Sequence, residues 1–301
     1  MGIAPAMIKL LMREGKQEVF SGHALTIGRQ NISPMTIRDL EKLAKEINFK
    51  LRPFPGNTHL DNKTAKNSFV TDKVLFLSMG FNGIDSIDYS DFEQCAITHD
   101  LNTNVPENLY NKYDLIFDGG STEHIFNVPK ALENYNKMLK IGGRIIHALP
   151  SNGLVDHGFY MFSPTLFWDY YLANSWDIKE ALFIRHPKDA DKGLWDIYCY
   201  SPHCLDMLSY LGLDKSKYAI YFVVKKTDKS TFNAPVQQGF YLEAWNGISN
   251  TKNVKFKTLY SGRKKIANLL PERLKVILRP LYLSILSRIP IRFFLKTVGK
   301  Y

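Results

Sequence analysis

The stretch that decides the fold runs from Tyr113 to Gly153 and is YDLIFDGGSTEHIFNVPKALENYNKMLKIGGRIIHALPSNG. An apolar run at 115–117 is followed by a helix-like stretch to about Lys140, and a second apolar run occupies 144–149. This succession of strand, crossover helix and strand is typical of a parallel sheet. The segment therefore predicts neighbouring parallel strands in an α/β fold.

Polar side chains follow the end of each of these two strands. They are Asp118, Ser121, Glu123 and His124 after the first strand, and Ser151 and Asn152 after the second. In open α/β sheets, ligands bind at the carboxyl ends of the strands. The same stretch therefore predicts a binding site at this edge of the sheet.

Further strands and helices alternate on both sides of this stretch. Strands are expected at 23–27, 83–88, 95–98, 178–185 and 218–225, and helices at 7–12, 33–48, 164–173 and near 205–211. Ser33 and Pro34 suit the start of the second helix, and 74–79 fits either a strand or a short helix. The pattern predicts a doubly wound, mostly parallel α/β sheet with an antiparallel edge formed by the last two strands.

Composition limits the class of protein. Hydrophobic residues make up 45% of the 301 residues, which is ordinary for a globular protein. Three cysteines, Cys95, Cys199 and Cys204, offer neither an even count nor zinc-ligand spacing, which favours a reducing, cytoplasmic location. No uninterrupted apolar run reaches the roughly 18 residues of a membrane span.

Positive charge is concentrated at the C-terminal end. From residue 261 onward the chain has ten Lys and Arg and one acidic residue, Glu272, so +9 of the net +10 lies there and about +1 elsewhere. The nearly neutral body argues against a nucleic-acid enzyme. We expect a catalytic domain at 1–230 and a C-terminal extension at 231–301. A basic amphipathic stretch at 274–289 suits an anionic membrane surface at the inner face of a membrane, or else docking on the protein's own core or on a partner.

The order of strand ends resembles that of class I S-adenosylmethionine-dependent methyltransferases, over roughly residues 20–226. In that family an acid after the second strand holds the ribose hydroxyls, and an Asp after the third strand contacts adenine. The resemblance assigns these roles to Asp88 in SIDYS and to Asp100 in ITHDLN. It implies S-adenosyl-L-methionine as the cofactor.

Two further motifs carry the resemblance. The stretch FDGGSTEH at 117–124 is similar to the fourth-strand signature of methyltransferases that act on small molecules, which implies cofactor contacts for Asp118 and Gly119. The stretch LKIGGR at 139–144 is similar to the turn before the family's fifth strand.

The first glycine motif departs from the family pattern. Only Gly28 remains of its glycines, and Thr26 stands in place of the usual acid. A cofactor without a pyrophosphate does not need a phosphate cradle, and one glycine still permits close backbone approach. Arg29 is expected to pair with the cofactor's methionine carboxylate. The altered motif keeps open a catalytically silent methyltransferase-like binding module, whereas the missing phosphate-binding glycines argue against a dinucleotide-dependent oxidoreductase.

The segment after the fifth strand, PSNGLVDHGFYMFSP at 150–164, is rich in aromatic residues and contains Asp156 beside His157. We interpret it as an active-site lid with His157 as the first candidate base, His124 as the second and Asp156 as a supporting acid. The alternatives are that its aromatic residues fill the core, that His157 caps a helix, and that Glu123 and His124 cap the helix that follows them in the sequence. The other histidines share no spacing that suggests a metal site, so none is predicted: His99, His147, His186 and His203.

These features together predict methyl transfer from S-adenosyl-L-methionine to a small-molecule, sugar or lipid-linked glycan acceptor, with no nucleic-acid partner. A silent binding module is the alternative.

Overall fold

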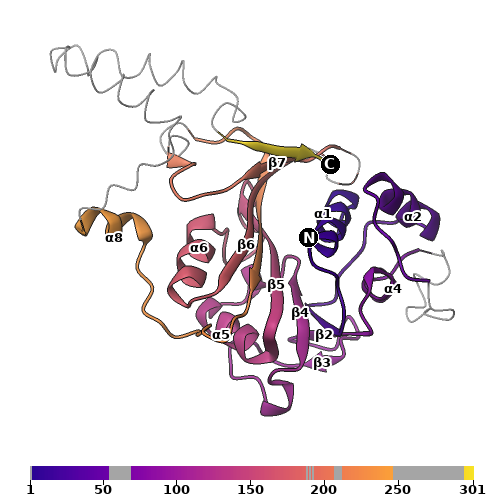
Figure 1. The fold of residues 1–301 in the computed structure, drawn as a ribbon, viewed down its shortest axis with the longest axis horizontal. Coiled ribbons are helices and arrows are strands. Elements are labelled where there is room, and N and C mark those ends of the chain that lie inside the picture. The colour runs from indigo at the N-terminus through magenta and orange to yellow at the C-terminus, as the bar shows by residue number, and fades with distance from the viewer. Residues whose placement is uncertain are drawn as a thin grey trace, which may run out of the picture.

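The computed structural model describes residues 2–53, 69–187, 189, 191, 193–206, 212–246 and 295–301. Within these residues the chain forms one mixed sheet with helices on both faces (Figure 1). The strands in chain order are β1 (His23–Ile27), β2 (Gly83–Asp88), β3 (Ile97–Thr98), β4 (Tyr113–Asp118), β5 (Leu139–Asn152), β6 (Asp177–His186), β7 (Asp196–Cys199), β8 (Lys217–Lys225) and β9 (Thr297–Lys300).

Their spatial order is β3-β2-β1-β4-β5-β8-β6-β7-β9. The first five strands are parallel, in the 3-2-1-4-5 order of Rossmann-like sheets. Strand β8 is antiparallel to both of its neighbours, β5 and β6. This confirms the predicted doubly wound fold and the antiparallel pairing of 178–185 with 218–225. That pair does not form the sheet edge, however, because β7 and β9 extend the sheet beyond β6.

Two helical layers cover the sheet (Figure 1). Helices α1 (Pro5–Gln17), α2 (Ile37–Glu46) and α4 (Asp72–Met79) cover one face, and α5 (Val128–Met138) and α6 (Pro164–Ala173) cover the other. Alternate residues of β4 serve the two cores: Leu115 and Phe117 pack toward α1, whereas Ile116 packs toward α5. A strand buried on both faces is a continuous apolar run in the sequence, which is why β4 was recognisable.

Two local structures differ from the sequence-based expectation. The second helix begins after Thr36, not at Ser33, because the Thr36 and Asp39 side chains form a reciprocal capping box with each other's backbone N–H groups. Residues 74–79 are helical, and the Thr71 hydroxyl caps that helix by accepting a hydrogen bond from the Val74 N–H at 3.2 Å.

The C-terminal end belongs to the sheet. Strand β9 pairs antiparallel with β7, so the last residues are not part of a separate appendage. Helix α8 (Gly239–Trp245) precedes residues 247–294, which lie outside the described residues together with the predicted amphipathic stretch at 274–289. Most of the helix expected near 205–211 also lies outside them. Within the described parts of the chain, no helix combines the length and apolar character needed to cross a bilayer.

Candidate functional site

The strand order reverses at β1, which lies between β2 and β4, and we refer to the carboxyl ends of these three strands as the crevice. Gly28 follows β1 there with a φ of 71°, and its N–H donates to the Ile87 carbonyl at 2.7 Å. A Cβ at Gly28 would lie 2.8 Å from the Ser121 Oγ and 3.5 Å from the Asp88 Oδ2. The predicted residues from the ends of β1, β2 and β4 therefore meet at the place where such sheets bind ligands.

Asp88 and Asp100 lie half-buried after the adjacent strands β2 and β3. The Asp88 Oδ1 accepts a hydrogen bond from the Tyr89 N–H at 2.7 Å. The Asp100 Oδ1 accepts hydrogen bonds from the backbone N–H and the side-chain amide of Asn102, and these hold the Asp100 pKa below its usual value. Each carboxylate thus uses one oxygen locally. The cofactor roles of both residues stay predictions.

Arg29 is engaged within the protein. Its guanidinium donates to both oxygens of Asp72, at 3.0 and 3.3 Å, and to the Gln94 carbonyl at 3.1 Å. Because both prongs of this fork are used by Asp72, the expected pairing of Arg29 with a cofactor carboxylate does not fit the structure. Arg29 instead fastens the loop after β1 to the start of α4.

Gln30 is a crevice residue that the sequence analysis missed. Its Nε2 donates to the Ile27 carbonyl at 2.8 Å, whereas its buried Oε1 has no hydrogen-bond partner. A Cβ at Gly119 would lie 2.3 Å from that same oxygen and 2.6 Å from the Phe117 ring, so a larger residue there would displace one or both side chains. The sequence alone does not indicate such a buried, unpaired amide oxygen. It results from the close packing of the segments that follow β1 and β4.

The Asp118 carboxylate does not reach the crevice, although we predicted a cofactor contact for it. It is fully buried and accepts hydrogen bonds from the Thr122 Oγ1 at 2.6 Å, from His147 Nδ1 at 2.8 Å, and from the N–H groups of Ser121 and Thr122. His147 Nε2 in turn lies 2.6 Å from the Tyr171 hydroxyl. These hydrogen bonds hold the turn that follows β4 in place.

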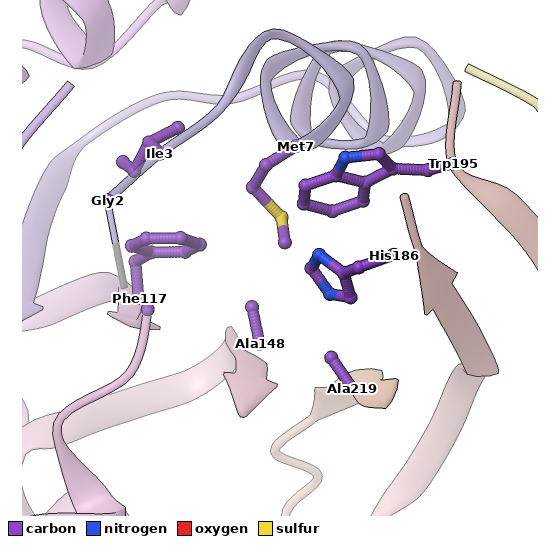
Figure 2. Close-up of a pocket in the computed structure, with 9 residues that line it drawn as sticks. Gly2, Ile3, Met7, Phe117, Ala148, His186, Trp195 and Ala219 are labelled. Carbon is purple, nitrogen blue, oxygen red and sulfur yellow. The ribbon is translucent and has the colours of Figure 1, made fainter. Parts of the chain in front are cut away.

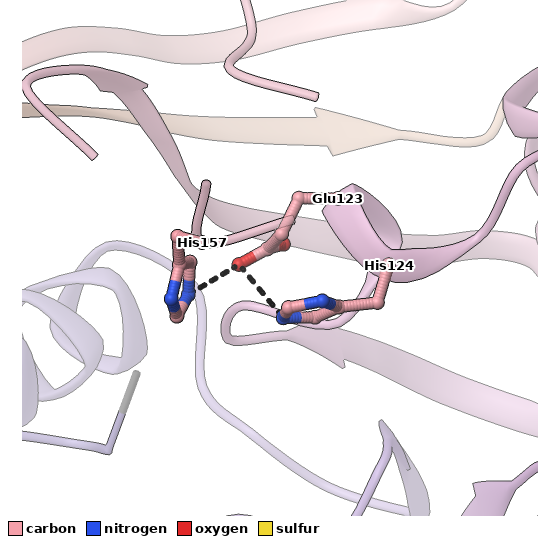
Figure 3. A group of neighbouring side chains, drawn as sticks. All are labelled: Glu123, His124 and His157. Carbon is pink, nitrogen blue, oxygen red and sulfur yellow. Dashed lines mark ion pairs between the residues drawn. The ribbon is translucent and has the colours of Figure 1, made fainter. Parts of the chain in front are cut away.

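A second cluster lies just beyond this turn and consists of Glu123, His124 and His157 (Figure 3). The Glu123 Oε1 lies 3.9 Å from His124 Nε2 and 3.7 Å from His157 Nε2. The Glu123 side chain is 0% exposed, and neither of its oxygens accepts a hydrogen bond from another residue. The two imidazoles are 46% and 34% exposed, so they form the open side of the cluster.

The loop after β5 closes over Glu123. The Tyr160 N–H donates to the Glu123 carbonyl at 3.2 Å. A Cβ at Gly158 would lie 2.9 Å from that carbonyl oxygen and 3.2 Å from His124 Nδ1, so this close approach requires glycine. The loop brings His157 to the turn after β4, and Ser121 at the start of that turn lies close to Gly28.

The aromatic residues of this loop divide between core and surface. Phe162 is buried in the core beside Phe167, as the alternative interpretation expected. Phe159 is 66% exposed and packs edge-on against the exposed Phe126, with ring centroids 5.7 Å apart. Asp156 is exposed and has a φ of 68°. The loop therefore contributes both a structural plug and an apolar surface beside the histidines.

Burial shifts the titration of the whole cluster. The pKa of Glu123 is raised to about 7, chiefly by burial and then by the nearby negative charge of Asp118. The pKa of His124 is lowered by burial and by His157, and that of His157 is lowered mainly by burial. At neutral pH both imidazoles are therefore uncharged, with ring nitrogens free to accept a proton or bind an ion.

A separate, small cavity lies on the α1 side of the sheet (Figure 2). It measures about 20 Å³ and is lined mainly by apolar groups, among them Met7, Phe117 and Trp195. The buried His186 points into it, its Nε2 has no hydrogen-bond partner in the structure, and burial lowers its pKa to about 4. A space of this size holds about one water molecule, so it does not form a substrate pocket.

Comparisons with known proteins gave matches among solved structures alone. No protein-family model and no curated protein matches the chain. Matching solved structures include an S-adenosylmethionine-dependent methyltransferase from Mesorhizobium loti at 9% identity, covering 50% of this chain and 84% of that one, with a TM-score of 0.32. Another, from Archaeoglobus fulgidus, is 10% identical and covers 73% and 94%, with a TM-score of 0.35. YcgJ from Bacillus subtilis is also 10% identical and covers 73% and 98%, with a TM-score of 0.37. At these values the likeness assigns no residue and no activity.

Proposed function

We propose that the protein is an S-adenosylmethionine-dependent methyltransferase whose acceptor binds beside Glu123, His124 and His157. The observation that supports this is the meeting of Gly28, Asp88 and Ser121 at the switch point of the sheet, with the cluster two residues further along the chain. A cofactor bound at this point would have a group able to take a proton nearby.

The crevice fits this cofactor better than a dinucleotide. A pyrophosphate needs a nest of glycine N–H groups, and the sequence offers a single glycine after β1. Asp88 presents a carboxylate oxygen near Gly28, which suits a ribose diol, and Asp100 occupies the corresponding place after β3 for adenine. When bound, the cofactor supplies an electrophilic methyl group on a sulfonium.

The cluster provides the proton acceptor that a hydroxyl acceptor requires. His157 is exposed and uncharged at neutral pH, with His124 beside it at a ring separation of 5.1 Å. The adjacent exposed rings of Phe126 and Phe159 offer an apolar surface for the body of the acceptor. Such a surface suits a small molecule, a sugar or a lipid-linked glycan.

Calorimetric titration with S-adenosylmethionine and with its demethylated product tests the proposal. The parent protein should bind both, and Asp88→Ala should weaken binding by about 5- to 150-fold, because the ribose hydroxyls lose a partner worth about 1–3 kcal/mol. Asp91→Ala removes an exposed acid from the same loop and should change nothing. Absence of binding by the parent at millimolar concentration would favour the silent binding module.

We further propose that the basic residues of 261–301 associate with an anionic membrane surface, which would hold the enzyme near a lipid-linked acceptor. The +9 charge of this segment supports the proposal. Sedimentation with vesicles containing anionic lipid should carry the protein down at low salt and release it at high salt. Equal sedimentation with neutral vesicles would refute the electrostatic association.

A further inference from the structure

A buried carboxylate without a partner is costly, because an isolated charge loses its hydration and a neutral acid leaves polar atoms unsatisfied. Glu123 is in this position: it is 0% exposed, and neither oxygen has a hydrogen-bond partner. Its Oε1 faces two imidazole nitrogens at 3.7 and 3.9 Å, which is too far for hydrogen bonds. The three donor atoms thus converge, and no hydrogen bond joins the Glu123 carboxylate to either imidazole.

We propose that Glu123, His124 and His157 form a binding site for a divalent transition-metal ion, with Zn²⁺ as the best match. The three donor atoms all lie within 4.8 Å of one another. Two imidazoles and one carboxylate are a common zinc ligand set, with metal–ligand distances of about 2.0–2.2 Å that place tetrahedral ligands about 3.3 Å apart. Rotation of the two exposed rings closes the remaining gaps.

Charge and backbone geometry also favour a cation here. The buried Asp118 adds negative potential next to Glu123 and is itself fully engaged in hydrogen bonds. Gly158 allows the loop carrying His157 to approach Glu123 and His124, where a Cβ would collide with the Glu123 carbonyl. The ligands thus come from two loops that the fold presses together. Spacing along the sequence could not reveal them, since His157 lies far from the Glu123-His124 pair.

Three protein ligands leave a fourth position for an acceptor oxygen, whose proton a metal ion makes more acidic. This consequence rests on the proposed function, whereas the metal site does not. Ligation uses the nitrogen lone pair of His157, so in the metal-loaded protein His157 holds the ion and does not serve as the base.

Titration of the full-length, chelator-treated protein tests the site, with Zn²⁺ followed by calorimetry and Co²⁺ by its visible absorption. We expect one ion per chain and at least tenfold weaker binding for Glu123→Gln and His157→Ala. Gly158→Ala should also weaken binding, although it removes no ligand. His203→Ala is the matched control: His203 lies 3.2 Å from an Asp206 oxygen and 3.6 Å from a Glu243 oxygen, and its loss should leave binding unchanged.

Three results would overturn the proposal. The first is the absence of a stoichiometric ion in the parent protein. The second is equal affinity in the parent, Glu123→Gln and His157→Ala, and the third is a cobalt–thiolate absorption band; each of these two places the ion elsewhere. S-adenosylmethionine binding, measured on the same samples without metal, reports separately on the proposed function.

Discussion

Two buried carboxylates five residues apart, Asp118 and Glu123, have opposite surroundings. Both are 0% exposed and each lies next to histidine. Asp118 accepts four hydrogen bonds, whereas Glu123 accepts none from any other residue that the structure describes. Buried polar groups normally have hydrogen-bond partners, so an unpaired buried carboxylate indicates a site that binds a proton, an ion or a ligand. Burial alone therefore does not distinguish structural from functional acids, but pairing does.

The histidines differ in the same way. His147 is fully buried, with both ring nitrogens engaged, by Asp118 and by the Tyr171 hydroxyl. His124 and His157 keep their Nε2 atoms near an unsatisfied oxygen and a third or more of each side chain exposed. The first arrangement holds the turn after β4 in place. The second leaves imidazole nitrogens accessible beside that turn. A rigid, fully hydrogen-bonded network thus supports the residues that are able to react.

The largest expected effect is on stability at Asp118. Asp118→Ala should lower the free energy of unfolding by about 3–5 kcal/mol, because it leaves the buried His147 and Thr122 without their partner. Urea unfolding followed by circular dichroism measures this, with Asp91→Ala as the control for losing an exposed acid. A loss below about 1 kcal/mol, the size of a single hydrogen bond, would show that the network does not stabilise the turn.

The sequence predicted the central strands well because a strand buried on both faces is a short continuous apolar run, although the apolar run at 74–79 is helical. The expected helix at 164–173 matches α6, since Ser163 and Pro164 give a strong start and Phe167 and Tyr171 lie on its buried side. The start of α2 was misplaced because Thr36-Asp39 and Ser33-Pro34 are both good caps locally. Strands β7 and β9 are too short to stand out, and they exist only through pairing with distant residues.

The location of the site could be predicted from the sequence, but the contacts of its residues could not. The positions of Gly28, Asp88, His124 and His157 just after predicted strands indicated where the site lies. The carboxyl ends of parallel strands lie at the same edge of the sheet. Charge state and contact depend on tertiary packing, which no local pattern encodes. Arg29 is therefore hydrogen-bonded to Asp72, and Asp118 is hydrogen-bonded within its own turn. Gln30 and Glu123, by contrast, have buried oxygens without a hydrogen-bond partner among the described residues.

A smaller effect on the free energy of unfolding is expected at Glu123. There, replacing the acid should stabilise the protein at high pH, whereas replacing Asp118 should destabilise it. The pKa of Glu123 is about 7 in the folded protein against 4.5 for the free side chain, so between these pH values the native state holds a proton that the unfolded chain has released. Stability should therefore fall as pH rises from about 4.5 to 7 and then level off, by up to about 3 kcal/mol. Glu123→Gln cannot lose a proton, so it should gain on the parent protein as pH rises.

Urea midpoints of both proteins at pH 5 and pH 8, with a chelator present, measure this gain, because shifts from all other groups cancel at each pH. Glu133→Gln is the matched control. Glu133 is paired with Lys130 and Lys137, which hold its pKa below the usual value, so its stabilising contribution is present at high pH and this variant should gain nothing there. A Glu123→Gln advantage of equal size at pH 5 and pH 8 would mean that Glu123 does not titrate between them. The contrast with Asp118 would then rest on packing and not on an unpaired acid.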